Sequence, residues 1–196
     1  MDGSRIVRAT SQTFLVPWVA ACVTAASIGA SLSLPSLAPG LPRLIFDALL
    51  VGLLQGVALR SVVRPGSWLA LTAAGLGLAL VVGVVGVVAT GLAFAALGNE
   101  NPLYVGLIYG LGAIVAGLVV GFVQGVGLPQ GRRLTPWLLG TAFGAPFVFP
   151  ALAFSWFPQE NVTTSVPAVI VGLVGGLAYG VISGVGLREA LRESPE

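Results

Sequence analysis

Six long apolar stretches dominate this sequence. They cover residues 13–34, 44–63, 67–97, 103–127, 136–157 and 165–187. Each is at least as long as the roughly 20 residues that a helix needs to cross the hydrocarbon core of a bilayer. A spanning segment is either a helix or a strand of a closed barrel, because backbone groups in lipid must be hydrogen-bonded internally. Barrel strands alternate apolar and polar residues, whereas these runs are continuously apolar. We therefore predict an all-α membrane protein with six transmembrane helices.

The composition excludes most catalytic centres. Only 8% of the 196 residues are charged, against about 25% in an ordinary soluble domain. The chain has no His, and Cys22 is its single cysteine, which excludes an internal disulfide and the usual zinc and haem sites. We expect no enzymatic activity, no metal and no cofactor. The arginines are scattered at segment ends, so nucleic acid is not an expected partner.

Arginine placement predicts the orientation in the membrane. Loops on the cytoplasmic side carry an excess of basic residues. Only Arg43 falls on the side that also holds Glu100 and Glu160. Eight arginines fall on the opposite side, which includes both termini: Arg5, Arg8, Arg60, Arg64, Arg132, Arg133, Arg188 and Arg192. Both termini are therefore predicted to be cytoplasmic. Because all nine basic residues are Arg, the composition suggests a GC-rich genome and hence a bacterial inner (plasma) membrane.

The chain repeats itself. At an offset of 69, residues 52–59 match residues 121–128, and Trp68 matches Trp137. A third copy of the first motif lies at residues 180–187, and Trp18 followed by Thr24 is a degraded copy of the second. The repeating unit is a helical hairpin, covering residues 12–64, 67–128 and 136–188 of a single integral membrane domain, 1–196. Each unit has two spans, so the copies are parallel. We expect three parallel helical-hairpin repeats in a pseudo-threefold bundle.

This motif resembles one found in uncharacterised bacterial multi-pass membrane proteins. The shared pattern is Gly-x-x-Gln-x-x-x-Leu-Arg followed by Trp, carried here by Gly52, Gln55, Leu59, Arg60 and Trp68. The second copy has Pro129 where the pattern has Arg. The resemblance implies a membrane location and no defined activity.

Small residues recur every four positions in the second helix of each hairpin. Such stripes let helix backbones approach closely in lipid. We expect these three helices to lie innermost and to meet one another through the stripes, either as tight packing or as the lining of a pore. The glycines are Gly52 and Gly56, then Gly117, Gly121 and Gly125, and then Gly172, Gly176, Gly180 and Gly184.

Few polar groups lie within the spans. Gln55, Gln124 and Ser183 occupy matching positions and are predicted to converge near the bundle axis, as interhelical clamps or as a site for a solute head group. Asp47 lies four residues after Arg43, which suggests an interfacial ion pair or, alternatively, a proton or cation site.

Aromatic residues and prolines mark further candidate features. Trp18, Trp68 and Trp137 fall at predicted helix starts and Trp156 at a helix end, which favours an aromatic belt at both membrane surfaces. Pro146 and Pro150, four residues apart, predict a kinked or broken fifth helix that either lines a substrate site or serves packing alone.

Two functional hypotheses follow. The first is an accessory or structural subunit of a larger membrane complex, whose partners are the lipid bilayer and other membrane subunits or further copies of the chain. The second is a transport or binding component for a neutral or apolar small molecule, with a layout similar to the substrate-binding subunits of energy-coupling-factor vitamin transporters. Binding of a carotenoid-like pigment is a third, narrower possibility.

Overall fold

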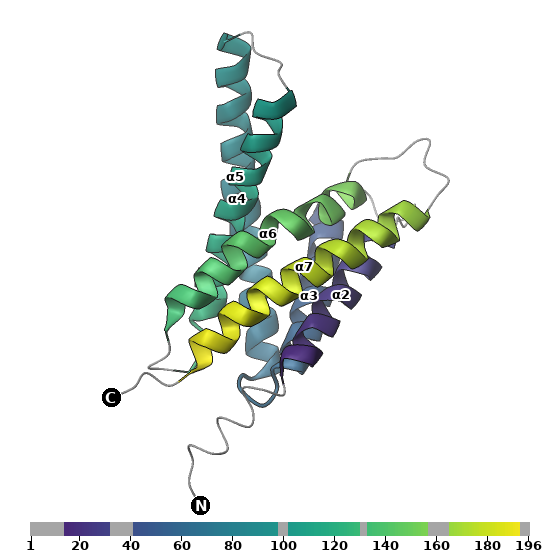
Figure 1. The fold of residues 1–196 in the computed structure, drawn as a ribbon. Helices are drawn as coiled ribbons and strands as arrows, with labels where there is room; N and C mark the ends of the chain where they lie inside the picture. The colour runs from purple at the N-terminus through teal and green to yellow at the C-terminus, as the bar shows by residue number, and fades with distance from the viewer. Residues whose placement is uncertain (1–13, 32–40, 98–101, 130–132, 157–164, 193–196) are drawn as a thin grey trace, which may run out of the picture.

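The described part of the protein is entirely helical. The structure is a computed structural model that describes residues 14–31, 41–97, 102–129, 133–156 and 165–192. Within these ranges it has six helices and no strand, which confirms the predicted all-α class (Figure 1). The helices are α2 (Leu15–Ser31), α3 (Leu41–Ala58), α4 (Pro65–Leu97), α5 (Pro102–Gly125), α6 (Leu134–Trp156) and α7 (Ser165–Leu191).

Helix boundaries differ from the apolar runs mainly at α3 and α7. Helix α3 begins at Leu41, ahead of the predicted start, because Pro42 suits a first turn, where an N–H has no helical partner. It ends at Ala58, and the chain then turns through Leu59–Val63. Helix α7 continues past the apolar run to Leu191. Its polar extension carries an exposed ion pair between Arg192 and Glu189, with 2.8 Å between nitrogen and oxygen.

Three of the described helices are long and apolar enough to cross a membrane. Their qualifying segments are Pro65–Gly83, Leu107–Gly125 and Val169–Leu191, and the other three helices contain shorter apolar segments. Helix α4 has 33 residues, which makes it about 50 Å long at 1.5 Å per residue. Figure 1 shows α4 and α5 rising together beyond the ends of the other helices.

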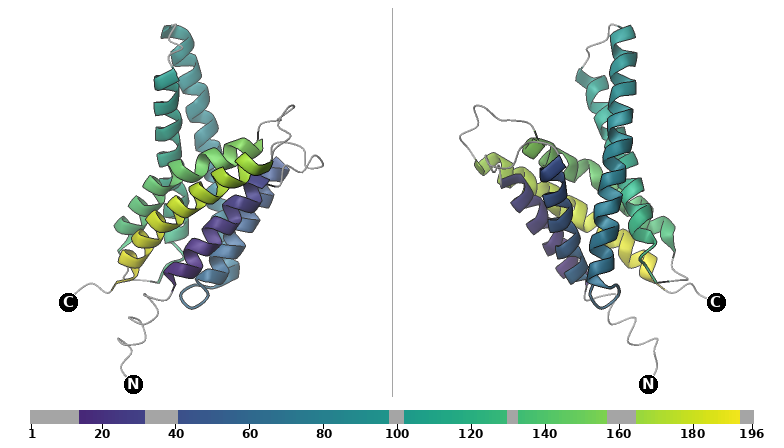
Figure 2. Two further views of the ribbon diagram at one scale, coloured as in Figure 1. Left: turned by 45° about the vertical axis from the view of Figure 1, so that its right-hand side comes forward. Right: turned by 180° about the vertical axis from the view of Figure 1, so that it is seen from behind.

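The six helices form a closed ring. Each helix contacts the next one along the chain, and α7 contacts α2 to complete the circle. Helix α6 also contacts α2 across the bundle. The start of α2 and the end of α7 lie at the same end of the bundle (Figures 1 and 2). This end also holds the exposed Arg60 and Arg64, in the turn between α3 and α4.

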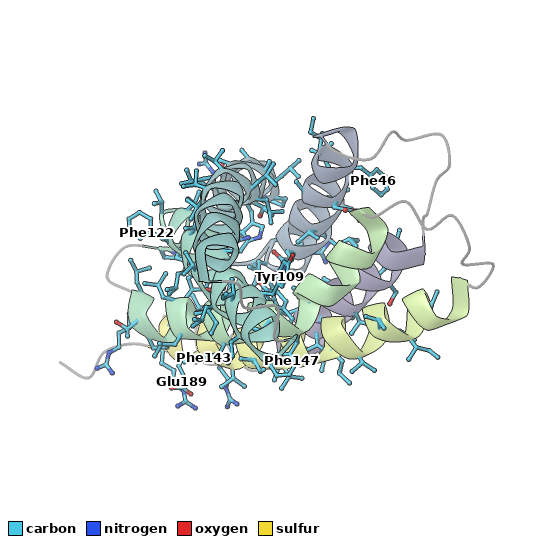
Figure 3. All side chains as sticks on the ribbon, turned by 90° about the horizontal axis from the view of Figure 1, so that it is seen from above. Phe46, Tyr109, Phe122, Phe143, Phe147 and Glu189 are labelled. Atoms are coloured by element: carbon cyan, nitrogen blue, oxygen red, sulfur yellow. The ribbon has the colours of Figure 1, made fainter. Side chains whose placement is uncertain are left out.

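Many large apolar side chains of the described helices are exposed, and many of the buried residues are alanines. Phe122, Phe143 and Phe147 are more than half exposed, and the view from above shows Phe122 at the outer side of the helices (Figure 3). Long exposed series run down several helices, such as Leu49, Leu53 and Val57 on α3. This distribution suits a lipid environment, where an exposed aliphatic side chain has no hydration cost.

The glycine stripes do not meet one another at the axis, contrary to expectation. Each packs instead against the following helix around the ring. The stripe of α3 faces α4, with Gly52 against Leu69 and Thr72. The stripe of α5 faces α6, where Gly117 lies against the backbone of Thr141 and Ala142. The third stripe, on α7, faces α2 and closes the ring.

The contact between α7 and α2 is backbone against backbone. A Cβ built on Gly172 would lie 2.6 Å from the carbonyl oxygen of Ala26, and one on Gly176 would lie 2.8 Å from the carbonyl of Cys22. Gly180 and Gly184 continue the contact toward Val19 and Trp18. A side chain at Gly172 or Gly176 would collide with backbone atoms of α2, so the two helices would have to move apart.

One substitution made at two glycines tests this packing. Ala stabilises a helix interior by about 1 kcal/mol relative to Gly. Gly112→Ala on α5 should therefore raise stability, because nothing lies within 4 Å of its built Cβ. Gly176→Ala should lower it by about 1–3 kcal/mol, since overpacking costs that much. Thermal unfolding in detergent measures both changes, and equal effects from the two variants would contradict the proposed packing.

Candidate functional site

Three tryptophans meet in the bundle interior. Trp18 lies in the first turn of α2, Trp68 in the first turn of α4 and Trp137 in the first turn of α6. Their ring centroids lie 5.8–6.3 Å apart, with edge-to-face or tilted packing. All three side chains are fully buried. Aromatic pairs at this spacing are favourable beyond the area that they bury.

The prediction of an aromatic belt is therefore wrong for these three residues. A belt tryptophan lies at the bilayer surface, whereas Trp18, Trp68 and Trp137 have 0% exposure. They form a core cluster with Leu59, Leu128 and Leu187 at the arginine-bearing end of the bundle. The side chain of the fourth tryptophan, Trp156, lies outside the described residues.

Each buried indole N–H donates to the neighbouring helix whose glycines face it. Trp18 donates to the Ser183 hydroxyl at 3.1 Å, and Trp68 donates to the Gln55 side-chain oxygen at 3.4 Å. Trp137 instead donates to the backbone carbonyl of Gly121 at 2.8 Å. The contacts of α2 with α7, of α4 with α3 and of α6 with α5 thus share one arrangement. In each, one helix supplies an indole donor and the other supplies a glycine stripe.

The two glutamines join these contacts across the axis. Gln124 donates through Nε2 to Gln55 Oε1 at 3.3 Å and to Thr72 Oγ1 at 2.8 Å. Gln55 Nε2 lies 3.6 Å from Cys22 Sγ. The structure therefore brings Gln55 and Gln124 into direct contact, and Ser183 joins the same region through Trp18.

A hydroxyl or thiol lies one helical turn after each tryptophan. Thr72 and Thr141 donate to the carbonyls of Trp68 and Trp137, which leaves their oxygens able to accept. Cys22 takes the corresponding place in α2, whereas Thr24, which follows Trp18 in the degraded sequence copy, is exposed. The spacing Trp-x-x-x-Thr or Trp-x-x-x-Cys was the available signal.

Tyr179 is a further member that sequence reasoning missed. It precedes Ser183 by one turn of α7, at the position that Val51 and Val120 occupy before the two glutamines. Its ring packs on the tryptophan cluster, and its hydroxyl approaches Gln55 and Ser183. The larger Tyr179 thus fills the space beside the short Ser183. The sequence signal for its role is that the repeat with Ser in place of Gln also has the larger Tyr in place of Val four residues earlier.

The remaining predicted residues lie away from this cluster. Helix α6 is continuous through Pro146 and Pro150, so the prolines do not break it. Gly175 of α7 approaches the carbonyl of Phe147 beside them, and the side chain of Pro150 lies outside the described residues. Asp47 is buried and faces Gly29 of α2, while its predicted partner Arg43 has no described side chain.

The cluster is neutral and its chemistry is hydrogen bonding alone. It contains amide, hydroxyl, indole and thiol groups but no carboxylate, imidazole or amine. Among the residues that the structure describes, no group of three potential metal ligands occurs. Comparison of the chain with protein-family models, curated proteins and solved structures found no match.

Gln55 should be the most sensitive polar residue of the cluster. Gln55→Leu would leave two buried donors, Trp68 Nε1 and Gln124 Nε2, without this acceptor. A loss of about 1–3 kcal/mol is expected, because an unsatisfied buried donor costs that much. Unfolding in detergent measures it, with Leu53→Ala on the lipid-facing side of α3 as the control. A Gln55→Leu variant as stable as the control would show that these bonds contribute nothing.

Tryptophan quenching distinguishes a core from a belt. A Trp156→Phe variant retains only the three clustered tryptophans. In bilayers of bromine-labelled lipid, its fluorescence should be quenched only weakly, because no lipid chain reaches the three rings. Quenching should increase severalfold for an exposed reference, Phe122→Trp in the same background. Strong quenching of the Trp156→Phe protein by shallow bromine labels would restore the belt interpretation.

Proposed function

We propose that the chain is a six-span membrane protein built from three parallel hairpin repeats about a pseudo-threefold axis. Supporting this are the closed ring of six helices and the three equivalent contacts between α3 and α4, α5 and α6, and α7 and α2. The matched tryptophans also meet one another at the centre. Helices α2, α3 and α6 would complete their spans through a tilted or interfacial arrangement of their shorter apolar segments.

The membrane we propose is a bacterial inner membrane, with both termini in the cytoplasm. The start of α2, the end of α7 and the described arginines at Arg60, Arg64 and Arg188 lie at one end of the bundle. Basic residues concentrate on the cytoplasmic side of membrane proteins.

The role we propose is that of a structural or accessory subunit without a catalytic centre. One observation carries this proposal: at the arginine-bearing end the axis is filled by three indoles packed on one another and by polar groups that mostly bond one another. A packed axis of this kind favours a rigid scaffold over a conduit. The glycine stripes are used inside the bundle, so partners would contact the apolar outer face, including the projecting parts of α4 and α5.

A binding or transport role for a neutral small molecule is the second candidate. It is favoured by one observation, the side-chain oxygen of Gln124, which is buried and has no hydrogen-bond partner among the described residues. A polar atom of this kind at the axis is the feature that a neutral solute would recognise.

Mild detergent extraction and native mass spectrometry test the two roles. A subunit should be recovered in a complex heavier than the 19.8 kDa chain, with defined stoichiometry. The variant Phe122→Ala/Phe143→Ala, which trims the outer face, should release it from that complex without unfolding it. Recovery of a lone chain that carries one small molecule would contradict the subunit role and support the second candidate.

A further inference from the structure

We infer that Gln124 Oε1 binds one small hydrogen-bond donor, a water molecule or the O–H or N–H group of a neutral solute, at the centre of the bundle. This inference does not depend on the accessory role proposed above. It rests on the orientation of one amide, on the contrast with its two counterparts and on its burial.

The orientation of the Gln124 amide is fixed by its neighbours. An indole N–H can only donate, so the atom of Gln55 that faces Trp68 is the oxygen. That oxygen also faces Gln124, which must therefore present its NH₂ group. Thr72 agrees with this assignment, because its hydroxyl hydrogen goes to the Trp68 carbonyl and its oxygen is left to accept. Rotating the Gln124 amide would set oxygen against oxygen.

The Gln124 oxygen lacks the partner that its counterparts have. Gln55 Oε1 accepts from Trp68, and the Ser183 hydroxyl accepts from Trp18. By the same arrangement Gln124 Oε1 would accept from Trp137, but that indole donates to the carbonyl of Gly121. The Gln124 side chain instead bonds Gln55 of α3 and Thr72 of the neighbouring helix α4. Its oxygen is left as an acceptor for a donor from outside the chain.

Burial makes such a donor necessary. Gln124 is 1% exposed, and its oxygen has no partner within the described residues. Buried polar atoms in folded proteins are nearly always hydrogen-bonded, often to an ordered water. Gln124 lies at the end of α5, one turn from the Val126–Leu128 turn at the arginine-bearing end of the bundle.

Infrared spectroscopy of the glutamine carbonyl tests the inference directly. Protein labelled with ¹³C at the glutamine side-chain carbonyl is reconstituted in bilayers, and the spectrum of Gln124→Met is subtracted to isolate the Gln124 band. Methionine has a similar length but no amide. A bonded carbonyl absorbs at lower frequency than a free amide in apolar solvent, so the expected Gln124 band lies at the bonded position. A band at the free position overturns the inference.

A crystal of the unaltered protein grown from a lipid phase provides the second measurement and does not depend on the variant folding. A map that resolves ordered waters should show a peak within hydrogen-bond distance of Gln124 Oε1. Native mass spectrometry identifies its source: the bare mass of the chain indicates water, and a stoichiometric adduct indicates a solute. A map with no peak at this oxygen rejects the donor site.

Discussion

The arrangement of this bundle depends on the hydrogen bonds of three buried indoles. A tryptophan N–H has one bonding capacity, donation, and inside an apolar bundle it must find an acceptor. Trp18 and Trp68 reach a side-chain oxygen on the adjacent helix, and Trp137 reaches a backbone carbonyl. Each bond fixes both the neighbour of a helix and its rotation about its own axis, which dispersion contacts between aliphatic side chains do not.

Glycine makes these bonds geometrically possible. The indole of Trp137 reaches the carbonyl of Gly121, and a Cβ at Gly121 would collide with Thr141, one turn after Trp137, and so push α6 away. The stripes on α5 and α7 bring whole helix backbones into contact in the same way. Close backbone approach and a buried donor therefore act together: the glycines set the distance between helices, and the indoles set their register.

Much of the fold could be predicted from the sequence, and the centre of it could not. The helices could be predicted because a long apolar run in a bilayer is either a helix or a barrel strand, and these runs lack the alternation of a barrel strand. The convergence of Gln55 and Gln124 followed from their matching positions. The three tryptophans were predicted to lie at the bilayer surface because an indole near a helix end suits two environments equally well. One is the bilayer surface, and the other is a buried core that offers an acceptor to the indole N–H. The partner of each glycine stripe was also undetermined, since a four-residue spacing identifies a contact face without identifying what touches it. Tyr179 was missed because its role depends on the short side chain of Ser183 one turn away. Neither residue taken alone indicates that the two share one space.

The closure of α7 on α2 has a consequence for biosynthesis. Residues leave the ribosome in chain order, so Trp68 and Trp137 each meet an acceptor on a helix made before their own. Trp18 is different, because its acceptor, Ser183, is made 165 residues later. Until α7 is made, the indole of Trp18 lacks the acceptor that it has in the folded chain, and the face of α2 that carries Cys22 lacks the helix that packs against it.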